Sequence, residues 1–143
     1  MRRMRYPPNQ IPPLATGLIG GMGRNRPYAL LGELGAGKTT LVSEICRQLG
    51  VTEPTSSPTF SIVNQYETPE GPVYHLDCYR LNSIHEALDA GLEELFAGHE
   101  DYPIFVEWPA VVEDLLPDDT VVLRLKHGAD GTSREIIMPV GAF

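Results

Sequence analysis

The chain of 143 residues has little cysteine and no long hydrophobic run. Its two cysteines, Cys46 and Cys78, form no Cys-x-x-Cys pair, which disfavours a disulfide framework or a zinc site and favours reduced, structural thiols. No apolar stretch reaches the roughly 20 residues that cross a bilayer. The basic start is followed by four prolines within residues 7–13, where a signal peptide would need an apolar run. These absences predict a cytoplasmic protein with no membrane association.

Positive charge is also scarce. Eleven Lys and Arg stand against nineteen Asp and Glu, which gives a formal net charge of -8. Because binding to a phosphate backbone depends on neutralisation by cations, this balance disfavours a broad nucleic-acid-binding face. A small local patch, such as the arginines within residues 2–5, stays compatible with it.

The length and a hydrophobic content of 42% predict one globular domain. We interpret residues 1–13 as a flexible, proline-rich N-terminal arm and residues 14–143 as the folded domain. Helical spacing occurs in segments 14–22 and 39–49, in a segment that opens at Ser83 and should end at Gly91, in a second short segment 92–96, and in one or two turns at 111–115. Strand patterns occur at 28–31, 60–66, 73–79, 104–107, 120–126 and 134–138. The turn residues between 67 and 72 predict an antiparallel hairpin, so the fold class is α/β with a mixed sheet.

The strongest motif is a phosphate-binding loop. The segment Gly32-Glu-Leu-Gly-Ala-Gly-Lys-Thr39 fits G-x-x-x-x-G-K-[ST] and lies between a predicted strand and a predicted helix. Glycines let backbone N–H groups surround a phosphate, Lys38 can neutralise the β- and γ-phosphates, and Thr39 can offer its hydroxyl to Mg²⁺. The motif therefore predicts binding of a nucleoside triphosphate.

Other motifs narrow the class of P-loop protein. The chain contains neither the Asn-Lys-x-Asp guanine reader nor the Asp-x-x-Gly switch of GTPases, and it lacks the Ser-Gly-Gly signature of transporter ATPases. A small-molecule kinase stays possible, although an arginine-rich lid and an acceptor pocket are not evident.

Several polar residues follow the loop where a magnesium–nucleotide site would need them. Glu107 ends an apolar strand, where a carboxylate can orient water or hold Mg²⁺; the alternative is a solvent-facing acid at a strand end. Period-two alternation places His75 and Asp77 on one strand face, which either lines a site or is a partly exposed hairpin face. Thr59 is placed like a switch hydroxyl that senses γ-phosphate or Mg²⁺. Trp108 could be core, a nucleotide contact or a partner anchor.

Four segments together carry a resemblance to a known family: Gly32–Thr40, Ser57–Tyr66, Tyr74–Leu81 and Val106–Pro109. In their order and spacing they resemble the TsaE (YjeE) family of bacterial P-loop ATPases, which works in threonylcarbamoyl modification of tRNA adenosine beside the anticodon. The resemblance implies a small P-loop NTPase-like fold, the cofactors ATP and Mg²⁺, and the partner proteins TsaB and TsaD, with tRNA reached only through that complex.

The resemblance also implies site residues. The phosphates would be cradled by Gly35, Ala36, Gly37, Lys38, Thr39 and Thr40. Thr59 would be a switch-like threonine, Asp77 an acid associated with Mg²⁺, and Glu107 the acid required for hydrolysis, beside Mg²⁺. Trp108 would lie close to the nucleotide and the partner face.

We therefore expect a slow, partner-dependent ATPase that serves the tRNA-modifying complex. The alternatives are a small P-loop kinase of a metabolite or nucleoside, which would need an acceptor, and a binding module that responds to nucleotide without hydrolysing it.

Overall fold

A computed structural model describes residues 1–55 and 61–139. They form a seven-stranded sheet in the order β1-β7-β6-β2-β5-β4-β3. The strands are β1 (Arg2–Tyr6), β2 (Pro27–Leu31), β3 (Val63–Thr68), β4 (Gly71–Asp77), β5 (Ile104–Glu107), β6 (Val121–His127) and β7 (Arg134–Met138). The helices are η1 (Pro8–Gln10), α1 (Ile11–Met22), α2 (Lys38–Leu49), α3 (Ile84–Asp89), α4 (Leu92–Ala97) and η2 (Pro109–Leu115).

The middle of the sheet is parallel. Strand β2 pairs in parallel with both β5 and β6, and β4 pairs in parallel with β5. The β3–β4 hairpin and the β6-β7-β1 meander are antiparallel. The predicted mixed α/β sheet with a hairpin is confirmed, and the carboxyl ends of β2, β4, β5 and β6 share one edge, where loops of parallel sheets usually carry function.

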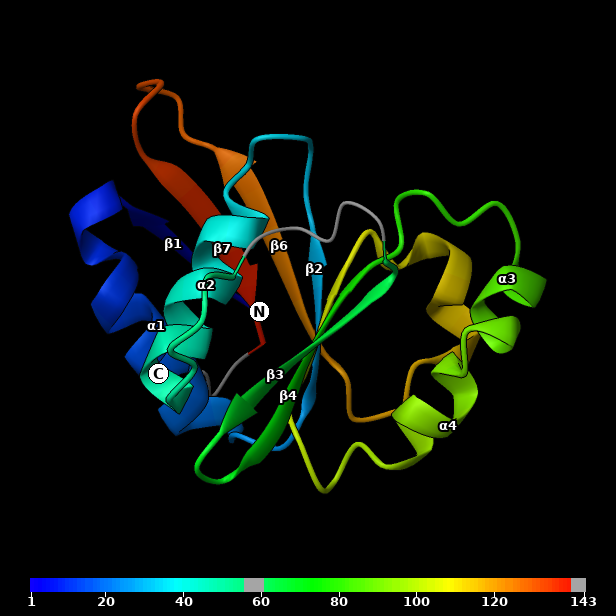
Figure 1. The fold of residues 1–143 in the computed structure, drawn as a ribbon. Helices are drawn as coiled ribbons and strands as arrows, with labels where there is room; N and C mark the ends of the chain where they lie inside the picture. Colours follow the sequence, from blue (N-terminus) through cyan, green and yellow to red (C-terminus); the bar gives the residue numbers. More distant parts are fainter. Residues whose placement is uncertain (56–60, 140–143) are drawn as a thin grey trace.

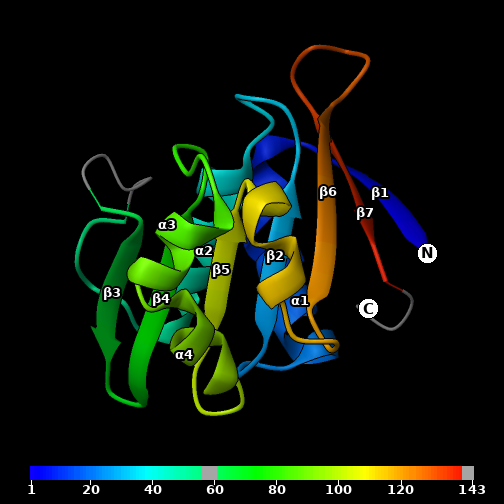
Figure 2. The ribbon, with the colours of Figure 1, turned by 90° about the vertical axis from the view of Figure 1, so that its right-hand side faces the viewer.

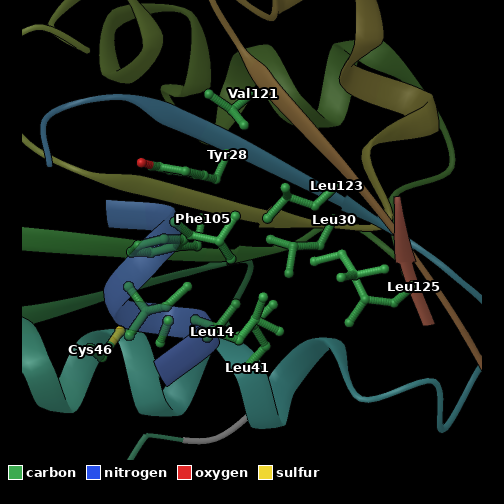
Figure 3. Close-up of a cluster of buried hydrophobic side chains, with 14 of the residues drawn as sticks. Leu14, Tyr28, Leu30, Leu41, Cys46, Phe105, Val121, Leu123 and Leu125 are labelled. Carbon is green, nitrogen blue, oxygen red and sulfur yellow. The ribbon is translucent and has the colours of Figure 1, made fainter. Parts of the chain in front are cut away.

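Helices cover both faces of the sheet. Figures 1 and 2 show α1 and α2 on one face and α3, α4 and η2 on the other. Each face buries its own hydrophobic cluster. In the larger one, Leu41 of α2 packs with Leu30, Leu123 and Leu125 of the sheet, as Figure 3 shows. The apolar residues of α2 recur at helical spacing and form one face, and this face packs the start of the helix against the sheet, beside the end of β2.

The N-terminal segment corrects the expectation of a flexible arm. Residues 2–6 form the edge strand β1, paired with β7 from Arg2 opposite Met138 to Tyr6 opposite Arg134. Tyr6 is buried, and burial raises the pKa of its hydroxyl to about 12. The prolines lie at the starts of η1 and α1, where a missing N–H leaves no intrahelical bond unmade. Proline here begins helices and does not keep the chain disordered.

Among the described residues, no helix combines the length and apolar character needed to span a membrane.

Candidate nucleotide site

The phosphate loop joins the end of β2 to the start of α2. Gly35 and Gly37 have φ of 80° and 99°, in the left-handed region that glycine adopts most readily. Gly37 is the N-cap of α2, whose twelve residues direct a helix N-terminus at the loop. Backbone N–H groups and the helix dipole at such a position favour an anion.

Lys38 is the buried cation of this loop, with 4% of its surface exposed. Its ammonium donates hydrogen bonds to the backbone oxygens of Gly32 and, at 3.3 Å, Glu33. It also lies 3.7 Å from the centroid of the Trp108 ring. Burial lowers the pKa of Lys38, and the carboxylates of Glu107 and Asp77 oppose that shift. A desolvated ammonium of this kind gains more from an arriving phosphate than an exposed one does.

Two carboxylates stand beside the loop at the ends of neighbouring strands. Asp77 of β4 is the register partner of Glu107 of β5, and Glu107 is also paired with Leu30 of β2. Glu107 is only 2% exposed, so the alternative of a solvent-facing acid is wrong. Thr39 donates a hydrogen bond of 2.8 Å from Oγ1 to Oε1 of Glu107. The loop threonine and the strand-end acid are therefore in direct contact.

His75 holds the second oxygen of Glu107. Its Nε2 lies 2.6 Å from Oε2, and its Nδ1 lies 3.4 Å from the hydroxyl of Tyr66 on β3. With a proton on Nε2 the ring donates to Glu107, and its Nδ1 can accept from the Tyr66 hydroxyl. His75 is fully buried, so the reading of this strand face as partly exposed is wrong at His75.

Trp108 follows Glu107 in an unusual backbone conformation. Its φ of 55° is the single positive value among the non-glycine residues that the structure describes. Left-handed backbone at such a residue costs on the order of 1–3 kcal/mol and often marks a functional site. The indole ring lies over Lys38 and 4.9 Å from the ring of Tyr79, which is 67% exposed. Two aromatic rings thus border the site on its solvent side.

One cavity of about 310 Å³ collects most of the residues that the sequence singles out. It is lined by Gly35, Ala36, Gly37, Lys38, Thr39, Thr40, Asp77, Glu107 and Trp108, together with Leu34, Tyr79 and Arg134. Thr59 lies outside the described residues. Sequence reasoning did not find Arg134 or Tyr79, and it named His75 without its bond to Glu107.

The donor set suits Mg²⁺. The Thr39 hydroxyl and the carboxylates of Asp77 and Glu107 are hard oxygen donors at one edge of the sheet. No cluster of three or more His, Cys, Asp and Glu ligands occurs in residues 1–55 and 61–139. Mg²⁺ does not require one, because it keeps several waters and takes its remaining ligands from one or two carboxylates and the substrate phosphates. The residues therefore fit a magnesium–nucleotide site.

The sequence that builds this site matches a known protein family. The family model described as "Threonylcarbamoyl adenosine biosynthesis protein TsaE" matches residues 8–136. This chain belongs to the TsaE family. The matched range contains the phosphate loop and the acids at the strand ends. The family match therefore includes the residues that line the cavity.

Three curated relatives carry the name tRNA threonylcarbamoyladenosine biosynthesis protein TsaE. The Bacillus subtilis protein is 39% identical over 75% of this chain and 65% of its own length. The Synechocystis protein is 49% identical over 56% and 52%, and the Treponema pallidum protein 38% identical over 75% and 76%. The chain thus spans between about half and three quarters of these relatives.

A solved structure shares the fold. The crystal structure of Bacillus subtilis YdiB superposes with a TM-score of 0.68 at 26% identity, over 96% of this chain and 84% of that one. At this coverage the likeness concerns almost the whole of this chain.

Proposed function

We propose that this TsaE-family chain binds ATP with Mg²⁺ and hydrolyses it slowly in the service of tRNA threonylcarbamoyladenosine biosynthesis. The observation that supports this most is the single cavity in which Lys38, Thr39 and Glu107 meet. Thr39 touches Glu107 directly, and Lys38 lies between the loop carbonyls and the Trp108 ring. Binding of a triphosphate would replace those carbonyl contacts with a stronger, oppositely charged partner.

We assign each residue of the site a role from its position. The loop N–H groups of residues 35–40 would hold the phosphates, with Lys38 on the β- and γ-phosphates. Thr39 and Asp77 would hold Mg²⁺, which when bound neutralises charge that develops on the transferring phosphoryl group. Glu107, oriented by donors on both oxygens, would hold the metal shell and the attacking water. Thr59 is proposed as the residue that senses the γ-phosphate.

The exposed hydrophobic border of the cavity supports a partner-dependent role. Tyr79 and Leu34 are large hydrophobic residues with 67% and 83% of their surface exposed, and both line the nucleotide cavity. A partner seated on them would cover the nucleotide and exclude water from it. We propose TsaB and TsaD as that partner, with tRNA contacted only through the complex. The negative net charge of the chain agrees with an indirect contact.

The test measures binding and turnover of Mg²⁺–ATP by the purified chain, with and without TsaB and TsaD. We expect weak turnover that rises when both partners are present. The variant Lys38→Ala should lose binding by at least tenfold, whereas Lys126→Ala, at an exposed lysine of β6, should retain it. Turnover that rises with a metabolite and not with the partners would instead indicate a kinase. Full function of Glu107→Ala in cells would indicate a binding module that needs no hydrolysis.

A further inference from the structure

Strand β1 leaves one edge of the sheet open. It is a terminal strand of the seven and pairs on one side with β7. No other strand of residues 1–55 and 61–139 lies along its second side, and Figure 2 shows this border of the sheet at the right, in blue. In an edge strand every second residue directs its N–H and C=O outward, so the edge is able to pair with a further strand.

The residues of β1 alternate between the two faces of the sheet. Tyr6 belongs to the hydrophobic cluster under α1, and Met4 packs against that cluster. Arg3 and Arg5 therefore lie on the opposite face, and both are exposed. Figure 2 shows that face of β7 and β1 with no helix in front of it. The two arginines thus lie at an open edge and on an open face.

The neighbouring strands extend the positive charge of this face. Two rows of register partners cross β1, β7 and β6, namely Arg3-Ile137-Arg124 and Arg5-Glu135-Lys126. The single acid of these rows, Glu135, pairs with Arg3 at 2.9 Å between Oε1 and Nε. Arg5 forms no ion pair within the described part of the chain, and neither does either cation of β6. The face therefore carries an excess of positive charge that an anionic partner would neutralise.

One further acid acts on this edge from the β6–β7 turn. Asp130 attracts Arg5 electrostatically. Its Oδ1, however, already accepts three hydrogen bonds, from the N–H groups of Thr132 and Ser133 and from the hydroxyl of Ser133. The Asp130 carboxylate is thus held in the turn and leaves the Arg5 guanidinium without a direct partner.

A cavity lies beside β1 on the face that α1 covers. It has a volume of about 230 Å³ and is lined by Met4, Arg5, Tyr6, Gln10, Pro13 and Leu14. These residues come from β1, η1 and α1, and none comes from β7, so the cavity lies toward the open side of β1. Met4, Pro13 and Leu14 give it apolar walls. A strand added to β1 would be able to place an apolar side chain there.

We propose that β1 accepts an extended segment of a partner protein in which two acidic residues are separated by one apolar residue. Alternate side chains of an added strand point to opposite faces of the sheet. The two acids would face Arg3 and Arg5, and the apolar side chain between them would enter the cavity beside Met4. Main-chain hydrogen bonds to the edge would supply affinity, and the charges would select the partner.

Two other occupants fit this edge less well. A second copy of β1 would place Arg3 and Arg5 opposite like charges, which destabilises a strand pair. RNA would be attracted by the cations, but the six residues of the two rows include no aromatic ring for a base to stack on. The edge is also separate from the border of Leu34 and Tyr79 at the nucleotide cavity, so the inference does not depend on nucleotide binding.

The experiment titrates the full chain into a fluorescein-labelled peptide, Thr-Val-Glu-Leu-Glu-Val-Thr, and follows fluorescence anisotropy. A second peptide has lysine at both glutamate positions, and a third has serine in place of leucine. We expect the glutamate peptide to bind, the lysine peptide not to bind, and the serine peptide to bind at least about tenfold more weakly than the glutamate peptide. In hydrogen exchange, the glutamate peptide should protect the amides of β1 and leave those of β3, the other terminal strand, unchanged.

Variants of the chain test the charges directly. Arg5→Glu should weaken the glutamate peptide at least about tenfold and strengthen binding of the lysine peptide, because opposite charges across a strand pair attract. Arg47→Glu makes the same charge change at an exposed arginine of α2 and should alter neither affinity. Should Arg5→Glu fail to fold, Arg5→Gln decides: a weaker glutamate peptide supports the proposal, and an unchanged affinity refutes it.

Three results would overturn the proposal. The first is a glutamate peptide that does not bind the unaltered chain at millimolar concentration, or that binds no better than the lysine peptide. The second is protection at β3 in place of β1. The third is an oligouridylate whose binding is lost in Arg5→Glu while the glutamate peptide does not bind, which would assign this face to RNA.

Discussion

Nε2 of His75 lies 2.6 Å from Oε2 of Glu107, with both side chains buried in the sheet. This contact and the hydrogen bond from Thr39 occupy both oxygens of the carboxylate. Glu107 is thereby fixed in direction before any nucleotide arrives. His75 is a positioning residue, because it reaches the cavity only through Glu107.

Replacement of His75 by Leu should lower the turnover number for ATP at least tenfold and leave the Michaelis constant within about threefold. The loss is expected because Glu107 would keep one donor and turn away from its present direction. Leaving one buried oxygen unpaired should also lower the free energy of unfolding by about 1–3 kcal/mol. Steady-state kinetics and urea unfolding measure the two effects.

Two further variants separate positioning from stability. His75→Gln keeps an N–H donor and should recover part of the turnover number. His85→Leu changes an exposed histidine of α3 and should leave the kinetics unaltered. A turnover number unaffected by His75→Leu would show that the contact has no part in catalysis.

Asp77→Asn should impair magnesium-dependent turnover more than nucleotide binding. The amide keeps the shape of the side chain and removes the charge that would face the metal. Turnover of this variant should therefore saturate at a higher Mg²⁺ concentration than turnover of the unaltered chain, and the affinity for ATP should change little. Asp114→Asn, at an exposed acid of η2, is the control. Superimposable magnesium curves for Asp77→Asn and the unaltered chain would contradict the assignment of Asp77.

The parts of the site that could be predicted from sequence are those with a local signal. The glycine spacing that ends at Lys38, together with the apolar run before it and the helical spacing after it, is sufficient to predict a strand, a phosphate loop and a helix, because these signals lie within a few residues of one another. Glu107 could be predicted from its place at the end of an apolar strand. The hairpin of β3 and β4 was evident from turn residues, although the strands begin at Val63 and Gly71.

Other parts depend on pairing between distant segments. The bond of His75 to Glu107 requires β4 and β5 to be neighbours in a particular register, which local periodicity cannot supply. Arg134 reaches the loop because β6 returns beside β2 and β7 turns back along it. The N-terminal strand has no comparable local signal, because the four prolines that follow it suggest a flexible arm, whereas residues 2–6 pair with β7.

Gly32→Ala should destabilise the fold by about 1–3 kcal/mol. A Cβ at this position would lie 2.6 Å from the backbone oxygen of Leu125, so β6 or the loop would have to move. Gly20→Ala, inside α1 with nothing within 4 Å of the added Cβ, should instead stabilise by up to about 1 kcal/mol through helix propensity. Urea unfolding of both variants checks the opposite signs, and equal effects would refute the steric reason.

Stability should fall as the pH rises above about 9, because four buried groups resist deprotonation in the folded state. Burial raises the pKa of Cys46 and Cys78 from 9.0 to about 12, and that of Tyr6 and Tyr28 from 10.0 to about 12. Their contribution is complete below the unfolded pKa values and is lost between pH 9 and 12, as the unfolded chain releases protons that the folded chain retains.

Urea unfolding at a series of pH values measures this loss, whose slope is at most about 1.4 kcal/mol per pH unit for each group. The double variant Cys46→Ala, Cys78→Ala should flatten the slope between pH 9 and 10, where only the thiols contribute strongly. It should leave the slope above pH 10, which the tyrosines share, partly in place. An unaltered slope in that variant would show that the two thiols ionise in the folded chain as readily as in the unfolded one.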